Sequence, residues 1–216
     1  MSLERANAAE DTIDLGAGLC LHGTRMRFDR NEEIFGEDEP AEYIYRVVSG
    51  AVRTMRFSSD GRRQILTFQL PGDVFGIETD EVHTFSAEAV CPTEVVMVRR
   101  SLLEKAASDD ARATRRWLEL TCQDLRNAQE HALILGRKGA GERVAAFLLR
   151  FSDRFTRGQE LDLPMSRADI ADYLGLTIET VSRSFSEMER TAAIDLPSSR
   201  HVVLRNRSAL MQLQAA

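Results

Sequence analysis

The sequence predicts an α+β protein in which an antiparallel strand region is followed by one long helix and a winged helix-turn-helix. Three observations predict this order. Short stretches of alternating polarity come first, with turn signals roughly ten residues apart. A charged, periodic stretch without proline follows, and its only glycine lies at its end. Helix caps and glycines then divide the rest of the chain into short elements. We expect a flexible leader over residues 1–17, a strand region over 18–100, a helix over 101–137 and a C-terminal domain over 138–216.

The first hundred residues contain the predicted strands. Residues 1–17 show no periodicity that would build a core, so we expect a loose leader. YRVVSGAVRTMRF predicts a strand, a glycine turn and a second strand, and Ser58–Gly61 carries the Asp-Gly signal of a hairpin turn. QILTFQL, SAEAV and EVVMVRR complete a series that is typical of a sandwich or barrel.

The predicted helix over 101–137 has apolar positions at coiled-coil spacing. One side of it can pack on the strands while the other meets a second chain, so we expect a homodimer. The alternative is an ordinary core helix. The predicted dimer interface consists of Leu118, Thr121, Cys122, Leu125, Ala128, Ala132 and Leu135.

The segment SRADIADYLGLTIETVSRSF predicts two short helices joined by a tight turn. Ser166 can cap a helix that begins at Arg167, and Gly175 can end it in a left-handed conformation. Thr177 can cap the next helix, whose Val181 and Phe185 would face the first. Helices joined in this way cross steeply, as in the DNA-binding motif. The glycine-rich stretch Gly136–Gly141 before it predicts a hinge.

Three polar residues share the exposed side of the second helix. Glu179, Ser182 and Arg183 have side chains that suit base edges, because Arg bonds guanine bidentately and Glu accepts from cytosine. The alternative is a small helical bundle whose surface is simply polar. AIDLPSSRHVVLRN predicts a wing, in which Arg200, His201 and Arg205 could contact phosphates. The predicted supporting DNA contacts are Ile178, Thr177, Thr180, Ser166, Arg167 and Arg200.

Composition limits the possible functions. The net charge of −6 argues against a nucleic-acid partner, but residues 138–216 carry +1 while the rest carry −7, so basic residues could still share one face. No apolar run is long enough for a membrane span, and no signal peptide precedes the strands, so we expect a cytoplasmic protein. Cys20, Cys91 and Cys122 are too far apart for a metal site, and we expect buried structural thiols, with a redox role for one left open.

This order of elements resembles the Crp/Fnr superfamily of bacterial transcription regulators, and the stretches IETVSR and FGIETDEVHTF are similar to its FixK-type members. The resemblance implies a β-roll (a double-stranded β-helix of the cyclic-nucleotide-binding type) and a transcriptional activator that contacts RNA polymerase, with Ser58–Arg62 as one exposed turn available for it. Glu179, Ser182 and Arg183 match the Glu-x-x-Ser-Arg pattern of members that read TTGAT half-sites. The resemblance therefore implies a TTGAT-N4-ATCAA-like palindrome, and genes for microoxic life, nitrogen fixation or denitrification.

The strand region departs from the sensors of that superfamily. Cyclic-nucleotide binders carry an arginine in an Arg-Ser/Thr-Ala signature, and here Phe85 stands in its place, although Gly76 and Glu78 of the pocket pattern remain. A buried phosphate without a cation is costly, so we expect no cyclic nucleotide. FixK-type members are generally held to bind DNA without an effector, so the resemblance implies no small-molecule effector. Oxygen-sensing relatives hold an iron–sulfur cluster with several N-terminal cysteines, and this N-terminus has only Cys20. His22 and His83 are poor candidates for a haem ligand, because each fits a surface or core position better, so we expect no cofactor.

Two rival functions remain open at this point. A ligand- or redox-responsive sensor of the same superfamily is the alternative, with an unidentified effector in the β-roll. An enzyme is disfavoured, because the sequence offers no Ser-His-Asp set, no phosphate-binding glycine loop and no carboxylate pair in a plausible site.

Overall fold

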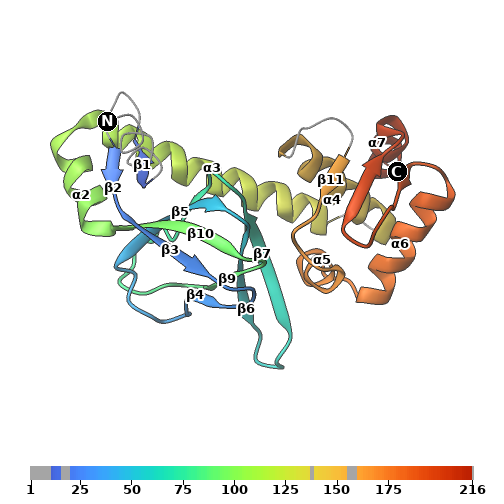
Figure 1. Cartoon of the computed structure of the whole chain (residues 1–216), viewed down its shortest axis with the longest axis horizontal. Helices are drawn as coiled ribbons and strands as arrows, with labels where there is room; N and C mark the ends of the chain where they lie inside the picture. The colour runs from blue at the N-terminus through green and yellow to red at the C-terminus, as the bar shows by residue number, and fades with distance from the viewer. Residues whose placement is uncertain (1–10, 16–19, 137–138, 155–159, 216) are drawn as a thin grey trace. The chain divides into compact units, whose positions relative to one another are not determined.

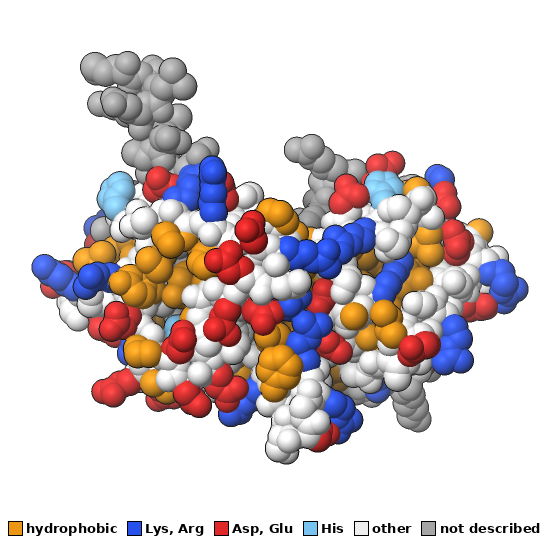
Figure 2. All heavy atoms as spheres, turned by 60° about the horizontal axis from the view of Figure 1, so that its bottom comes forward, with side chains coloured by type: hydrophobic (Ala, Val, Ile, Leu, Met, Phe, Trp, Pro, Cys, Tyr) orange, Lys and Arg blue, Asp and Glu red, His pale blue; other side chains and the backbone are white. Residues whose placement is uncertain are grey.

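The computed structural model describes residues 11–15, 20–136, 139–154 and 160–215 (Figure 1). The chain divides into two compact units. The first consists of Met1–Ser58 and Leu66–Ala128, and the second of Ser59–Ile65 and Gln129–Ala216. On the face drawn in Figure 2, acidic side chains gather over the strand-bearing unit, in keeping with the charge asymmetry of the sequence. Among the described residues, no helix is long and apolar enough to cross a membrane.

In the described part of the first unit, the strands form two four-stranded antiparallel sheets and a small two-stranded sheet. The strand order is β3-β10-β5-β8 in one large sheet and β4-β9-β6-β7 in the other, and β1 pairs with β2. The strands are β1 (Thr12–Asp14), β2 (Cys20–His22), β3 (Thr24–Phe28), β4 (Glu33–Phe35), β5 (Tyr43–Ser49), β6 (Val52–Phe57), β7 (Arg63–Gln69), β8 (Val74–Phe75), β9 (Ser86–Ala89) and β10 (Thr93–Arg99). The first three residues of β7 are assigned to the second unit. The alternating pattern of the sequence arises because each strand places one face in the core.

A hydrophobic core lies between the two large sheets. Phe35 of β4 and Val52 of β6 pack with Tyr45 of β5 and Phe75 of β8. The rings of Phe35 and Tyr45 are 5.3 Å apart, and those of Tyr45 and Phe75 are 5.2 Å apart, within the range of favourable aromatic pairs. The predicted sandwich-like strand region is therefore confirmed.

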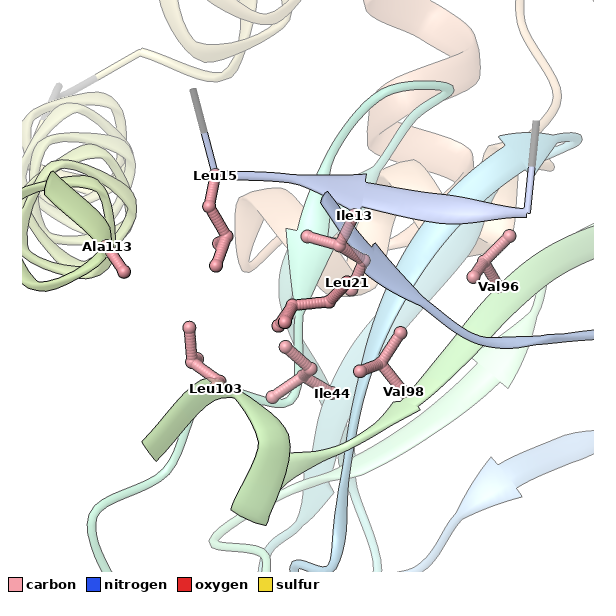
Figure 3. Close-up of a cluster of buried hydrophobic side chains, with 8 residues drawn as sticks. All are labelled: Ile13, Leu15, Leu21, Ile44, Val96, Val98, Leu103 and Ala113. Atoms are coloured by element: carbon pink, nitrogen blue, oxygen red, sulfur yellow. The ribbon is translucent and has the colours of Figure 1, made fainter. Parts of the chain in front are cut away.

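The segment just before the strands is not the loose leader that we expected. Ile13 and Leu15 are buried with Leu21 in a second cluster, where Leu103 and Ala113 cover them (Figure 3). β1 is three residues long and pairs with β2, so its burial depends on contacts that no local periodicity reveals. The prediction is wrong for residues 12–15, and residues 1–10 and 16–17 lie outside the described part of the chain.

The predicted single helix over 101–137 is two helices, α2 (Arg100–Asp109) and α3 (Ala111–Leu135). Asp110 between them is extended, with φ −140° and ψ 116°. Its carboxylate accepts the Arg112 N–H at 2.8 Å and its carbonyl accepts the Ala113 N–H at 2.9 Å. Asp110 therefore caps the start of α3, a role that short carboxylates fill well, and this explains the break without proline or glycine.

The second unit contains the helix-turn-helix and its wing. Its elements beyond α3 are α4 (Ala140–Arg154), β11 (Glu160–Asp162), α5 (Arg167–Leu174), α6 (Ile178–Arg190), β12 (Ile194–Asp195), β13 (His201–Leu204) and α7 (Arg207–Ala215). The wing is a three-stranded sheet in the order β11-β13-β12. β11 and α7 were not predicted. Residues 137–138 of the predicted hinge lie outside the described residues, and Gly136 ends α3 in a turn.

Candidate nucleic-acid interface

Ser166 caps α5, as the sequence predicts, and in the structure Ser166 and Asp169 form a capping box. The Asp169 N–H donates to Ser166 Oγ at 3.1 Å, and the Ser166 N–H donates to Asp169 Oδ2 at 2.9 Å. The two bonds satisfy backbone donors that the first helical turn would otherwise leave unpaired. Ser166 is therefore engaged within its own helix, in addition to any contact with a ligand.

Gly175 makes the turn between α5 and α6. It has φ 62° and ψ 42°, the left-handed conformation that side chains with a Cβ disfavour, and its N–H donates to the Ala171 carbonyl. Thr177 caps α6, accepting the Thr180 N–H at 3.3 Å. Two residues thus separate the end of one helix from the cap of the next, so the helices are held in a fixed crossing.

One face of α6 is buried and the opposite face is exposed. Val181, Phe185 and Met188 are at most 2% exposed, and they pack within the unit. Glu179, Ser182 and Arg183 are all exposed. The structure therefore brings the three predicted base-reading residues together on one accessible helical surface, as the 3.6-residue period requires.

On this surface, the carboxylate of Glu179 lies near the guanidinium of Arg183. The pKa of Glu179 is lowered, most of all by a hydrogen bond from its own backbone N–H. A hydrogen bond with the Thr177 side chain and the positive charge of Arg183 lower it further. The Arg183 guanidinium donates to Thr180 Oγ1 at 3.4 Å. Glu179 is thus held as an acceptor-only carboxylate beside a five-donor cation, the complementary pair needed to read cytosine and guanine edges.

The six predicted supporting residues differ in their accessibility. Ile178 and Thr177 are exposed at the start of α6, and Thr180 and Arg200 are partly buried. Arg167 is partly buried at the start of α5, where its guanidinium lies over the Phe185 ring. No pattern in the sequence predicts this contact, because the two residues are far apart in the chain and share no periodicity.

Two of the residues predicted to contact phosphates, His201 and Arg205, form hydrogen bonds with carboxylates of the wing itself. His201 Nδ1 lies 2.6 Å from Asp162 Oδ1, and this hydrogen bond raises the pKa of His201. The Arg205 guanidinium donates to Asp195 at 2.9 Å. Arg200 is the residue at the wing turn whose basic side chain has no ion pair among the described residues.

A buried histidine of α3 packs against Tyr173 of α5. His131, in the last turns of α3, stacks on the Tyr173 ring with centroids 3.9 Å apart, and its Nε2 lies 2.7 Å from the Tyr173 carbonyl oxygen. Tyr173 is buried, which raises its pKa to about 12. Sequence reasoning missed this pair, because His131 falls within the stretch assigned to the dimer helix.

The predicted dimer surface is largely accessible on α3. Leu118 and Leu125 are 62% and 57% exposed, and Thr121, Ala128 and Ala132 are exposed as well. Large apolar side chains at this exposure, seven residues apart, are typical of a helix face that meets another surface. Cys122 and Leu135 are partly buried within the chain.

A cavity of about 240 Å³ lies in the first unit between the strands and α3. Phe35, Phe75 and Phe85 form apolar walls, and Glu78 and Asp124 supply carboxylates. No lysine or arginine is among its described lining residues. Burial, followed by the charge of Asp73, raises the pKa of Asp124 to about 6. An anionic ligand would meet negative charge here with no cation to offset its desolvation.

The remaining cysteines and histidines of the strand unit have varied environments. Cys20 is exposed, and Cys91 and Cys122 are partly buried, so the expectation of three buried thiols is wrong. His83 is buried and stacks on Phe35, with ring centroids 3.6 Å apart, while His22 is exposed. His83 thus occupies a core position against the cavity wall.

Comparison with known proteins identifies the family. Residues 142–213 match the Crp-like helix-turn-helix domain, and residues 25–110 match the cyclic nucleotide-binding domain. The nitrogen fixation regulation protein FixK of Azorhizobium caulinodans is 49% identical over 219 residues, covering 99% of this chain and 88% of that protein. The chain belongs to the FixK-type branch of the Crp/Fnr family. It is a transcriptional regulator with a helix-turn-helix DNA-binding domain, not an enzyme.

One solved structure and a second sequence relative agree with this FixK-type assignment. FixK2 from Bradyrhizobium japonicum is 51% identical, with a TM-score of 0.88 over 91% of this chain and 99% of that chain. The FixK of Rhizobium meliloti is 42% identical over 196 residues, 89% of either protein. A CooA mutant from Carboxydothermus hydrogenoformans shares only the fold, at 17% identity and a TM-score of 0.74 over 89% of this chain and 88% of that chain. The expected fold and FixK-type family are thus confirmed.

Proposed function

We propose that this FixK-type regulator is a homodimeric activator that reads an inverted repeat resembling TTGAT-N4-ATCAA through Glu179, Ser182 and Arg183. The observation that carries the proposal is the shared exposed face of α6, opposite the buried Val181 and Phe185. Arg183 bonds a guanine, Glu179 accepts from a cytosine amino group and Ser182 bonds an adjacent base. Further contacts hold the protein in this register on the duplex, and they come from Thr177, Ile178, Thr180, Ser166, Arg167 and Arg200.

Fluorescence anisotropy with the TTGAT-type duplex tests base reading. The competitor is a duplex with TGTGA half-sites, the kind that cyclic-AMP-type members of the superfamily read. Arg183→Ala should cost about 1–3 kcal/mol and relax selectivity at its guanine. Arg190→Ala is the matched control, since Arg190 is exposed on the same helix and paired with Glu187. Unchanged affinity and selectivity in Arg183→Ala would remove Arg183 from the reading surface.

The proposal includes binding to DNA without a small-molecule effector. The lining of the 240 Å³ cavity supports effector-free binding. Its described charged side chains are two carboxylates, which cannot neutralise the phosphate of a cyclic nucleotide. Protein purified without ligand should therefore bind the duplex in air at full affinity. Cyclic nucleotide or haem that raised this affinity at least tenfold would instead favour the sensor, the alternative function of the same fold.

The proposed dimer uses the exposed α3 face. Leu125→Glu places a charge in the seam, and sedimentation velocity should then report a monomer at concentrations where the wild type is dimeric. Gln123→Glu is the control, because it adds the same charge to an exposed position of α3 outside the predicted seam. A dimeric Leu125→Glu protein would contradict this interface.

The regulated genes follow from the relatives only by analogy. The proteins of Azorhizobium caulinodans and Rhizobium meliloti are named as nitrogen fixation regulators. We propose the same class of targets, microoxic, nitrogen-fixation or denitrification genes, with RNA polymerase as the partner at the promoter. Mapping the bound sites in the genome tests this, and sites confined to unrelated promoters would contradict it.

A further inference from the structure

We propose that Arg167 is a positioning residue that sets the crossing of α5 and α6 by stacking on Phe185, rather than serving only as a phosphate contact. The Arg167 Cζ lies 3.1 Å from the centroid of the Phe185 ring, and Phe185 is 1% exposed. This inference rests on the proposed base-reading role of α6, and it adds to that role a residue that touches no base.

Three features of its site disfavour the charged guanidinium of Arg167. Arg167 is the first residue of α5, where the positive end of the helix dipole repels a cation. Its Nη1 is buried and has no hydrogen-bond partner within the described residues. Burial also lowers the pKa of Arg167 to about 10. The ring of Phe185 is the favourable contact that offsets these terms, since a desolvated guanidinium over an aromatic face is strongly attracted.

The contact joins the two helices at a point that controls the reading surface. Phe185 lies two residues beyond Arg183 and three beyond Ser182, on the buried side of the same helix. A shift of Phe185 toward the core or away from it would move α6 as a rigid rod and misplace both polar side chains. The planar guanidinium fits the ring, whereas the ammonium of a lysine is a point charge with a strong hydration shell.

The two roles of Arg167 differ in their experimental signatures. A phosphate contact contributes equally to all sequences and adds to the salt dependence of binding, and lysine can replace it. A positioning contact contributes to selectivity between sequences, has little effect on the salt slope, and depends on Phe185. Arg167→Lys, Arg167→Met, Phe185→Leu and the double variant Arg167→Met/Phe185→Leu separate these roles.

Each variant would be titrated by anisotropy with the TTGAT-type duplex and with a duplex altered at the guanine, at several salt concentrations. We expect Arg167→Lys, which keeps the charge, to lose about 3- to 30-fold in selectivity, the range of a cation–π contact, with an unchanged salt slope. Arg167→Met should lose selectivity by the same factor. The double variant should lose no more than the worse single variant, because both remove one contact. Arg190→Met, which removes the same charge from an exposed site on α6, is the control.

The opposite pattern would overturn the inference. If Arg167→Lys behaved as wild type, Arg167→Met weakened both duplexes equally with a slope smaller by about one, and the effects of Arg167 and Phe185 were additive, Arg167 would be a phosphate contact alone. A wild-type protein without selectivity would instead refute base reading by α6, so the two failures are distinguishable. If Phe185→Leu did not fold, as judged by circular dichroism, the comparison of lysine with methionine at position 167 would still decide.

Discussion

Replacing Gly175 with alanine isolates the energetic cost of the turn between the two helices. A Cβ built at this position meets Arg143 Nη1 at 3.7 Å and Leu135 Cδ2 at 3.8 Å, which are ordinary van der Waals distances. The added methyl group therefore clashes with nothing, and the cost is confined to the left-handed backbone at φ 62°. That conformation costs an L-residue about 1–2 kcal/mol, and the lower unfolded-state entropy of alanine returns roughly 0.4–1 kcal/mol. We expect a net loss of about 1 kcal/mol.

Differential scanning calorimetry of the full chain measures this loss in the transition of the DNA-binding unit. For a domain of its size, about 1 kcal/mol lowers the midpoint by roughly 4–8 °C. Gly175→Asn is the control, because asparagine tolerates the left-handed region better than alanine does. Gly175→Val should cost more than either, since a β-branched side chain is strained there.

The order Asn, Ala, Val is the decisive result. If Gly175→Ala unfolded at the wild-type temperature, the backbone conformation would not carry the cost that we assign to it. If Gly175→Asn were as unstable as Gly175→Ala, the loss would come from the new side-chain atoms, and the steric reasoning would be wrong.

Further perturbations test the cap, the cavity and the wing. Ser166→Ala removes the acceptor of the Asp169 N–H and should cost about 1 kcal/mol by calorimetry, while Ser166→Thr should not; equal losses would contradict the capping box. Folding raises the pKa of Asp124 from 3.8 to about 6, so its stabilising proton is lost as the pH rises through 6. Asp124→Asn should therefore stabilise the protein by about 1–3 kcal/mol at pH 8 and by little at pH 3, in urea unfolding; an equal gain at both values would refute the shift. The hydrogen bond with Asp162 raises the pKa of His201, so His201 loses its positive charge only above pH 6.5. Because a protonated His201 would attract DNA phosphates, DNA affinity should fall as the pH rises above 6.5, and His201→Asn should remove that dependence.

Local chemistry made the helix-turn-helix predictable from the sequence. Ser166, Gly175 and Thr177 each act through atoms within a few residues of themselves, so the caps and the turn follow from residue type and spacing. The apolar period of α6 likewise decides which face is buried. The positions of Glu179, Ser182 and Arg183 on the other face then follow from helical geometry, although their contacts with bases remain a prediction.

Long-range pairing explains what the sequence did not reveal. β1 carries two apolar residues in a short, polar context, and only its pairing with β2 buries them. Asp110 lies inside a stretch that is otherwise helical, and its capping bonds outweigh the continuity of the pattern. The stacking of Arg167 on Phe185 depends on how two helices cross, which no periodicity in either helix contains.

The exposed leucines of α3 affect how the regulator would respond to its own abundance. When two chains must associate through Leu118 and Leu125 before DNA is bound, occupancy at low concentration rises as about the square of the chain concentration. A regulator controlled by synthesis and degradation would then convert a modest change in its level into a larger change in transcription. The affinity of one helix surface for its copy would set the cellular concentration at which the target genes switch on.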